Sequence, residues 1–351
     1  MAWVLDTEYI DPQELTALVR LSLAEQQVNS FGLARWLPNV TIDDITFKYT
    51  KGGTGGLAEA SVYRSWDTES RIGRREGVAQ VMGELPPISE KIPLNEYDSL
   101  RIRNLDNADP MRQAIARDAY RLATNIAARF ELGKGEALAD ARFTINENRV
   151  QLAPVDFGRR PEHSVIAAVL WSDHANARPL DDLEAWVQTY VDTNGTPPAA
   201  QMMARTVLAN FRQCDQVVRQ VYPLAPSGSA PMVSVEQLNT VLSSLDLPPI
   251  ELNDARVSVD GTPKRIMPDD AVVFLPQPGA TDAASPTDLG GFLLGTTAES
   301  MEPEYASVAG RAGVVAATWK TKDPVRLWTH AAAVGMPVVR EPDLTLKAVV
   351  L

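Results

Sequence analysis

The chain has 351 residues, which is enough for two or three compact domains. Hydrophobic residues make up 45% and charged residues 22%, a balance typical of a folded chain, and the formal net charge of −12 argues against a protein that mainly binds nucleic-acid phosphates or an anionic membrane. No apolar run reaches the roughly 18–20 residues that span a bilayer, and the N-terminus lacks a basic, apolar leader, so we expect a soluble chain made in a cytoplasm.

Helix-capping residues and apolar periodicity predict the elements of the first half of the chain. Asp11 and Pro12 are typical of a helix start, and so are Asp109 and Pro110, while Gly133 is a plausible helix stop. The predicted elements are a helix to Val28, one strand at 40–49, two extended pieces at 57–66 and 78–82, and a long helix at about 110–132. The glycine-punctuated stretch 51–84 buries little by itself, since an isolated hairpin is marginal in water.

The second half mixes strands and helices. Asn194-Gly195 ends one predicted helix, and Ser234 with Gln237 forms a capping box at the start of another. The predicted elements are strands at 141–145 and 150–155, helices from Pro179 to Asn194, from Arg205 to Tyr222 and up to Leu245, strands at 256–259 and 271–275, an exposed loop at 277–291 and a last strand at 344–350.

The residues that could perform chemistry favour structural interpretations. The glycine cluster at 51–56 lacks the Lys-Ser/Thr pair and the following helix of a phosphate-binding loop. Cys214 lies on the apolar side of its predicted helix, which indicates a buried, inert thiol. Ser172, Asp173 and His174 are adjacent in sequence, a poor arrangement for a catalytic triad, and His163 and His330 stand apart.

Three acidic pairs complete the candidates for metal or acid–base chemistry. Asp181-Asp182 lies at a predicted helix start, where carboxylates stabilise the helix dipole, and Asp269-Asp270 lies in a turn. Asp43-Asp44 has no assigned role. We therefore predict no catalytic, cofactor-binding or metal-binding residues.

One basic cluster, Arg64, Arg71, Arg74 and Arg75, stands out in this acidic chain. Its charge favours contact with an acidic surface. An ordinary solvated loop is the simple alternative, and nucleic-acid contact is a weaker one because only Tyr63 and Trp66 supply nearby aromatic rings.

Several short patterns, in a shared order, resemble the lambda-like protein E coat family of tailed phages, which has the Hong Kong 97-type fold. They are Asp109-Pro110 with Arg112, Arg117 and Arg121; Val150 to Arg159; Trp171-Ser172 followed by Pro179 to Glu184; Asp260-Gly261 followed by Lys264 to Val273; Asp323-Pro324 with Arg326; and Pro337 with Pro342-Asp343. They span about residues 90–351, and the first ninety residues match in layout only.

The resemblance implies an α+β fold with an N-terminal arm, an extended E-loop hairpin, a spine helix, and peripheral and axial domains. The implied segments are an N-arm at 1–43, an E-loop at 44–92, a peripheral domain at 93–179 with a spine helix at about 110–132, an axial domain at 180–319, and a return to the peripheral domain at 320–351. The loop at 277–291 would be a candidate for the capsomer axis.

The implied function is that of a major capsid protein, assembled in the bacterial host cytoplasm into pentamers and hexamers of an icosahedral virion shell around packaged double-stranded DNA. A cement or decoration protein, a scaffold and a portal would be partners, with no cofactor, membrane or sequence-specific DNA binding. The E-loop would lie over a neighbouring subunit and contact it through Leu57, Val62, Arg64, Trp66, Arg71, Ile72, Arg74 and Arg75. Because no Lys occurs between Gly52 and Glu84, we predict no isopeptide cross-link from this loop.

Two other functions stay open at this point. An encapsulin-like compartment would share the fold but enclose a cargo enzyme, which co-purifying protein would reveal. A cytosolic hydrolase that uses the acidic pairs would be a monomer or small oligomer with a polar pocket, and the lack of a credible nucleophile–base set argues against it.

Overall fold

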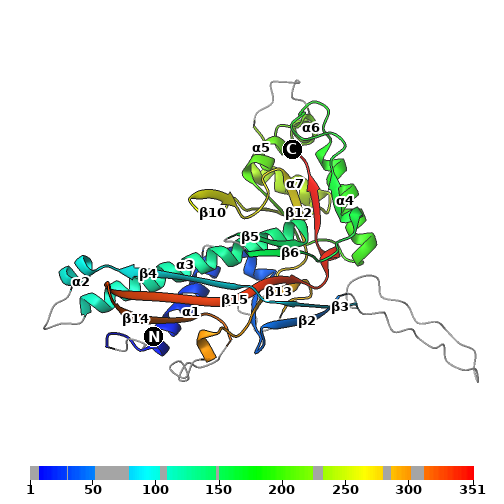
Figure 1. Ribbon diagram of the computed structural model, residues 1–351. Helices are drawn as coiled ribbons and strands as arrows, with labels where there is room; N and C mark the ends of the chain where they lie inside the picture. Colours follow the sequence, from blue (N-terminus) through cyan, green and yellow to red (C-terminus); the bar gives the residue numbers. More distant parts are fainter. Residues whose placement is uncertain are drawn as a thin grey trace, which may run out of the picture. The chain divides into compact units, whose positions relative to one another are not determined.

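Figure 1 shows the computed structural model of the chain, which describes residues 8–29, 31–51, 79–102, 109–147, 150–223, 232–279, 286–301 and 312–351. The chain divides into two compact units. Unit 1 comprises Met1–Lys48, Met82–Lys134 and Gly279–Val338, and unit 2 comprises Tyr49–Val81, Gly135–Pro278 and Val339–Leu351.

Unit 1 is a sheet covered by helices. Its elements are α1 (Pro12–Asn29), η1 (Gly32–Arg35), β1 (Asn39–Thr41), β4 (Pro87–Leu94), α2 (Glu96–Ile102), β13 (Gly290–Leu294), η3 (Glu299–Met301), β14 (Val315–Lys322), β15 (Val325–Val339, whose last residue belongs to unit 2) and most of α3 (Asp109–Asp140). The strand order is β1-β13-β15-β14, and β4 also pairs with β15. The strands β2 (Thr46–Lys51) and β3 (Ala79–Glu84) form a separate pair.

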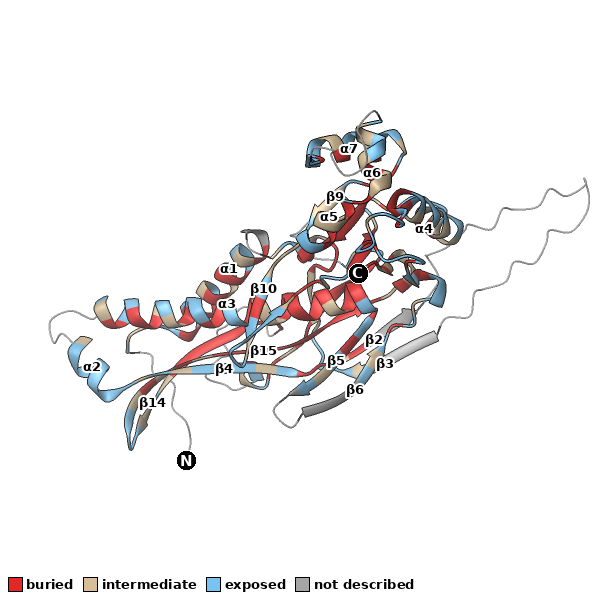
Figure 2. Cartoon of the chain, turned by 90° about the horizontal axis from the view of Figure 1, so that it is seen from above, coloured by how far each residue is buried: buried red, intermediate tan, exposed pale blue. Residues whose placement is uncertain are grey.

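The apolar stripes of α1 and α3 form the core of unit 1 against this sheet. Leu15 and Val19 from α1 join Ile115 and Phe130 from α3, all of them buried. Figure 2 shows these stripes as red bands on helices whose other sides are pale blue or tan. Thr16 fixes α1 to β14, since its hydroxyl donates to the Ala316 carbonyl at 3.0 Å and accepts from the Ala316 N–H at 3.0 Å.

Unit 2 has a second sheet, in the order β7-β16-β12-β8-β9. Its elements are β5 (Arg142–Glu147), β6 (Val150–Asp156), η2 (Pro161–His163), β7 (Ser164–Ile166), α4 (Pro179–Asn194), β8 (Ala200–Met203), α5 (Arg205–Phe211), α6 (Asp215–Val221), α7 (Val235–Ser244), β9 (Ile250–Leu252), β10 (Arg256–Val259), β11 (Thr262–Arg265), β12 (Ala271–Leu275), η5 (Pro342–Leu344) and β16 (Leu346–Val349). Helices α4 to α7 bury apolar residues in one cluster with this sheet, among them Trp171, Trp186, Phe211 and Phe274.

Many of the predicted elements are confirmed. Gly195 ends α4 in the left-handed conformation, with φ of 74°, and the Ser234–Gln237 capping box is present at α7. Helix α1, the start of α3, the paired strands β5 and β6, and the last strand β16 lie where the sequence predicts them.

The predicted end of the long helix at Gly133 is wrong, because α3 continues to Asp140. Gly135, two residues further along the helix, lies in a close contact with another part of the chain. A Cβ there would lie 2.2 Å from the Ile266 carbonyl oxygen, so only glycine lets the two backbones approach. The helix ends where Ala141 takes a φ of 49°.

The single strand predicted at 40–49 is two strands in different sheets. Between them, the Asp44 carboxylate accepts from the Thr46 N–H at 3.1 Å and from the Thr46 hydroxyl at 2.8 Å, a side-chain turn that interrupts the strand. This gives Asp44, one residue of the unassigned acidic pair at 43–44, a structural role.

Three further predictions are corrected in unit 2 and in the segment after it. The helix predicted at 205–222 is interrupted between α5 and α6, where Cys214 adopts an extended conformation at the start of α6. The turn at Asp260-Gly261 joins β10 to β11, a strand that the sequence analysis missed. The exposed loop predicted at 277–291 includes buried Leu289 and the start of β13, and its residues 280–285 lie outside the described residues.

Candidate functional site

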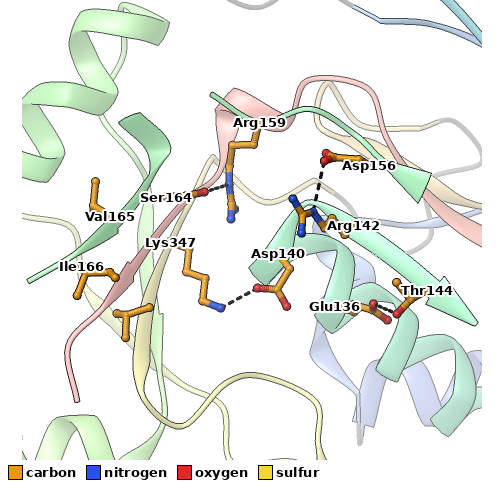
Figure 3. A pocket seen from close by; sticks show the side chains of 11 residues that line it. Glu136, Asp140, Arg142, Thr144, Asp156, Arg159, Ser164, Val165, Ile166 and Lys347 are labelled. Atoms are coloured by element: carbon orange, nitrogen blue, oxygen red, sulfur yellow. Dashed lines mark hydrogen bonds and ion pairs between the residues drawn. The ribbon is translucent and has the colours of Figure 1, made fainter. Parts of the chain in front are cut away.

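A polar pocket of about 420 Å³ lies in unit 2 where α3 ends, between β5, β6, β7 and β16 (Figure 3). Three acidic and three basic side chains line it. Lys347 donates to Asp140 at 2.6 Å, Arg142 pairs with Asp156 at 3.3 Å, and Thr144 hydrogen-bonds to Glu136. The formal charges of these side chains therefore cancel. Such a lining holds neighbouring elements together by ion pairs and is less suited to binding an ion.

Arg159 is the central residue of this pocket. Its guanidinium donates to the Leu138 and Ala139 carbonyls at 3.4 and 2.7 Å, which are acceptors that the end of α3 leaves free. It also donates to the hydroxyls of Thr345 and Ser164, each at 3.1 Å. Burial lowers the pKa of Arg159 to about 10, so it stays charged at neutral pH and stabilises the negative end of the helix dipole.

We expect Arg159→Met to reduce the free energy of unfolding by about 2–3 kcal/mol, because charged hydrogen bonds to partly buried acceptors are lost. Arg160→Met is the matched control. The Arg160 side chain is 63% exposed and pairs with Asp343 at 3.0 Å, so its loss should cost at most about 1 kcal/mol. Chemical denaturation of the two unassembled variants measures this difference, and equal losses would contradict the capping role.

A groove of about 590 Å³ lies in unit 1 beside the bases of β2 and β3. Its floor is apolar and includes buried Leu85 and Val334. Exposed Asp43, Asp44 and Glu84 and half-buried Glu299 line it as well. Such a groove suits a partner segment that carries both apolar and basic side chains.

Cys214 and His163 are buried, whereas Ser172 and Asp173 are exposed and His174 is half-buried. Burial raises the pKa of the Cys214 thiol to about 12, and its Sγ lies 3.5 Å from the Trp171 carbonyl oxygen, which agrees with the predicted inert thiol. His163 contacts the Thr345 carbonyl at 3.1 Å and the Thr193 hydroxyl at 3.0 Å. His174 contacts Asn210 at 2.9 Å. The hydrogen bonds that the structure gives these three side chains go to backbone carbonyls and to the Thr193 and Asn210 side chains, and none of them joins one of the three to another.

The two other acidic pairs also have structural partners. Asp182 accepts from the Trp171 indole at 3.0 Å, and burial raises the pKa of its carboxyl. Asp181 pairs with Arg178 at 3.2 Å, and Asp269 pairs with Arg265 at 3.1 Å. Within the described ranges, no three His, Cys, Asp or Glu residues gather as a metal site would require. None of the helices described there is long and apolar enough to cross a membrane.

The eight predicted contact residues of the E-loop, Leu57, Val62, Arg64, Trp66, Arg71, Ile72, Arg74 and Arg75, lie outside the described residues. Their role stays a prediction.

One buried pair was missed by the sequence analysis. Lys134 is fully buried in α3, with Nζ 5.6 Å from the centre of the Phe292 ring, and Glu131 is buried one turn before it. The Glu131 carboxylate accepts from the Leu33 N–H at 2.7 Å. Lys134 follows Ile126 and Phe130 at a spacing of four residues, so its place on the apolar stripe was readable from the sequence.

Comparisons with known proteins give a family from one family model and a fold from solved structures. The family model described as "Phage major capsid protein E" matches residues 40–350. A crystal structure described as a prophage capsid protein of Escherichia coli CFT073 is 14% identical, with a TM-score of 0.63, and the match covers 96% of this chain and 99% of the other. A phage-related protein of Bordetella bronchiseptica RB50 is 12% identical, with a TM-score of 0.57, covering 99% and 97%. No curated protein matches the chain.

Proposed function

Because the chain belongs to the phage major capsid protein E family, we propose that its copies assemble as pentamers and hexamers around packaged double-stranded DNA. The protein is a structural component of the virion, forms an icosahedral shell, has the mixed α+β Hong Kong 97-type fold, and is not an enzyme. The observation that carries the proposal is the family match over residues 40–350, which includes most of both compact units.

We propose further that the E-loop of each copy binds a neighbouring copy. Its basic residues Arg64, Arg71, Arg74 and Arg75 and its apolar residues complement the acid-lined apolar groove of unit 1. Contacts of this kind are individually weak but repeat at every subunit, so together they can close a shell. A cement protein, a scaffold and a portal remain proposed partners, as does the division into N-arm, E-loop, peripheral and axial domains.

The E-loop contact is tested by reversing its charge. We expect a variant with Arg64, Arg71, Arg74 and Arg75 all changed to Glu to form no shells, because acidic loops would face acidic grooves. The matched control changes the same four residues to Lys, which keeps the charge and should keep assembly. Electron microscopy counts the shells, and thermal unfolding checks that both subunits fold. Normal shells from the Glu variant would contradict the contact.

The contents of the shell separate this function from the compartment alternative. Particles made with the phage's portal and packaging machinery should hold DNA that resists added nuclease. Particles that hold a co-purifying enzyme and no DNA would favour the encapsulin-like alternative.

A further inference from the structure

A projecting hairpin and a helix in unit 2 carry opposite charge. The hairpin consists of β10 and β11, joined by Asp260 and Gly261 with φ of 49° and 79°, a two-residue turn that matches the twist of the strands. Each strand has four residues, so the hairpin extends about 13 Å. Val257 is its only buried residue. An isolated hairpin of this size gains little from its own packing.

Ion pairs fix the base of the hairpin, but two of its basic side chains take part in no ion pair with the described residues. Arg265 pairs with Asp254 at 3.3 Å and with Asp269 at 3.1 Å, and Arg205 also pairs with Asp254, at 2.9 Å. These contacts use the carboxylates of Asp254 and Asp269, and the third carboxylate, Asp260, is exposed in the turn. Arg256 and Lys264 are exposed, and neither makes an ion pair with any residue that the structure describes. The hairpin therefore presents unpaired positive charge from a firmly held base.

Helix α4 presents the opposite charge. It contains four acidic residues and no Lys or Arg. Its inner side is buried through Leu183, Trp186 and Tyr190. Asp181, Glu184 and Asp192 are exposed and follow one stripe with Gln188, at spacings of three and four residues. We call these three acidic residues the acidic stripe of α4. Asp181 pairs with Arg178 at 3.2 Å, so Glu184 and Asp192 supply the charge that has no ion-pair partner among the described residues.

The hairpin and the acidic stripe lie on opposite sides of unit 2. Figure 1 places β12 between β10 and α4, and Figure 2, which looks from a perpendicular direction, also shows β10 and α4 apart, with β9 and α5 between them. The topology agrees. The hairpin follows β9 at one edge of the sheet, and α4 contacts η2 and η5, which flank β7 and β16 at the other edge. One copy therefore cannot bring the two surfaces together.

We propose that the β10–β11 hairpin of one copy binds the acidic stripe of α4 on the next copy around a capsomer. Two different surfaces on opposite sides of one chain make a head-to-tail contact, and such contacts form rings when the rotation closes. Charge complementarity would set the register between copies. This inference rests on the proposed assembly into pentamers and hexamers.

Chemical cross-linking tests the contact directly. The only native cysteine, Cys214, is fully buried, so cysteines introduced by Lys264→Cys and Glu184→Cys react alone. A short bismaleimide is the reagent, since a disulfide spans only about 4 Å between Cβ atoms. We expect oligomers up to pentamers and hexamers on a denaturing gel of the assembled particles. Lys264→Cys with Glu236→Cys, an exposed position on α7, is the control and should give none.

Charge reversal provides the second readout. Glu184→Lys and Lys264→Glu should each lower the assembled fraction about tenfold, because like charges then face each other, and the double variant should restore it to within about twofold. Shells of the Lys264→Cys/Glu184→Cys variant that give no ladder would overturn this contact while leaving the proposed function in place. A Lys264→Glu variant that assembles into normal shells but no longer holds DNA would also overturn this contact. A wild-type protein that stays monomeric in the presence of its scaffold would contradict both the hairpin contact and the proposed function.

Discussion

Gly135→Ala should destabilise the protein by about 3 kcal/mol or more, although alanine is the better helix former. In an exposed helix, this change stabilises by up to about 1 kcal/mol. Here the new Cβ would lie 2.2 Å from the Ile266 carbonyl oxygen and 2.8 Å from the Ile266 side chain. The backbone of Ile266 must move. The free-energy cost of overpacking this contact exceeds the gain in helix propensity from glycine to alanine. Denaturant unfolding of the unassembled subunit measures the change.

Gln113→Ala is the matched control, because Gln113 is exposed on the same helix. It should be neutral or slightly stabilising. If Gly135→Ala were also neutral, then α3 and Ile266 could not be in the close contact that the structure shows.

Glu131→Gln should have a similarly large effect, of about 3 kcal/mol. The change keeps an amide oxygen that can accept from the Leu33 N–H but removes the negative charge facing buried Lys134. An unpaired charge would then be left in the core, beside the Phe292 ring. Adding Lys134→Met to Glu131→Gln should recover most of the loss, because a buried ion pair can often be replaced by apolar groups. A loss that persists in the double variant would contradict this explanation.

The same pair predicts a pH dependence. Burial lowers the pKa of Lys134 to about 8 from its ordinary 10.5. Between these two values the unfolded chain binds more protons than the folded one, so this residue makes stability rise with pH from about 8 to 10.5. Lys134→Met should lose that rise. Denaturation at several pH values checks it, and identical profiles for wild type and Lys134→Met would contradict the assigned burial.

Local patterns predicted most helix starts, because capping and apolar periodicity are properties of a few neighbouring residues. Ser234 with Gln237 and Asn194-Gly195 are examples. Failures occurred where a distant contact decided the local structure. The helix stop predicted at Gly133 is wrong because α3 continues through Gly135, which lies against the Ile266 backbone. Cys214 keeps helical spacing although the helix is interrupted there and its thiol packs on Trp171.

In the candidate site, too, local patterns were readable from the sequence and contacts between distant residues were not. The resemblance of short patterns between residues 90 and 351 predicted the family, which the family match confirms. Arg159 was part of one such pattern, but its hydrogen-bond partners could not be read from that pattern, because the end of α3 and Thr345 come from distant parts of the chain. The opposite placement of the hairpin and α4 likewise depends on the strand order of the sheet.

The central claim is that this chain builds a closed shell, and its assembled mass tests that claim most directly. The protein is purified alone and with its phage's scaffold and portal, its mass is measured by light scattering after size exclusion, and any large fraction is imaged by negative stain. We predict closed shells, or rings of five and six copies that become shells when scaffold is present. A monomer or small oligomer under both conditions would contradict the account.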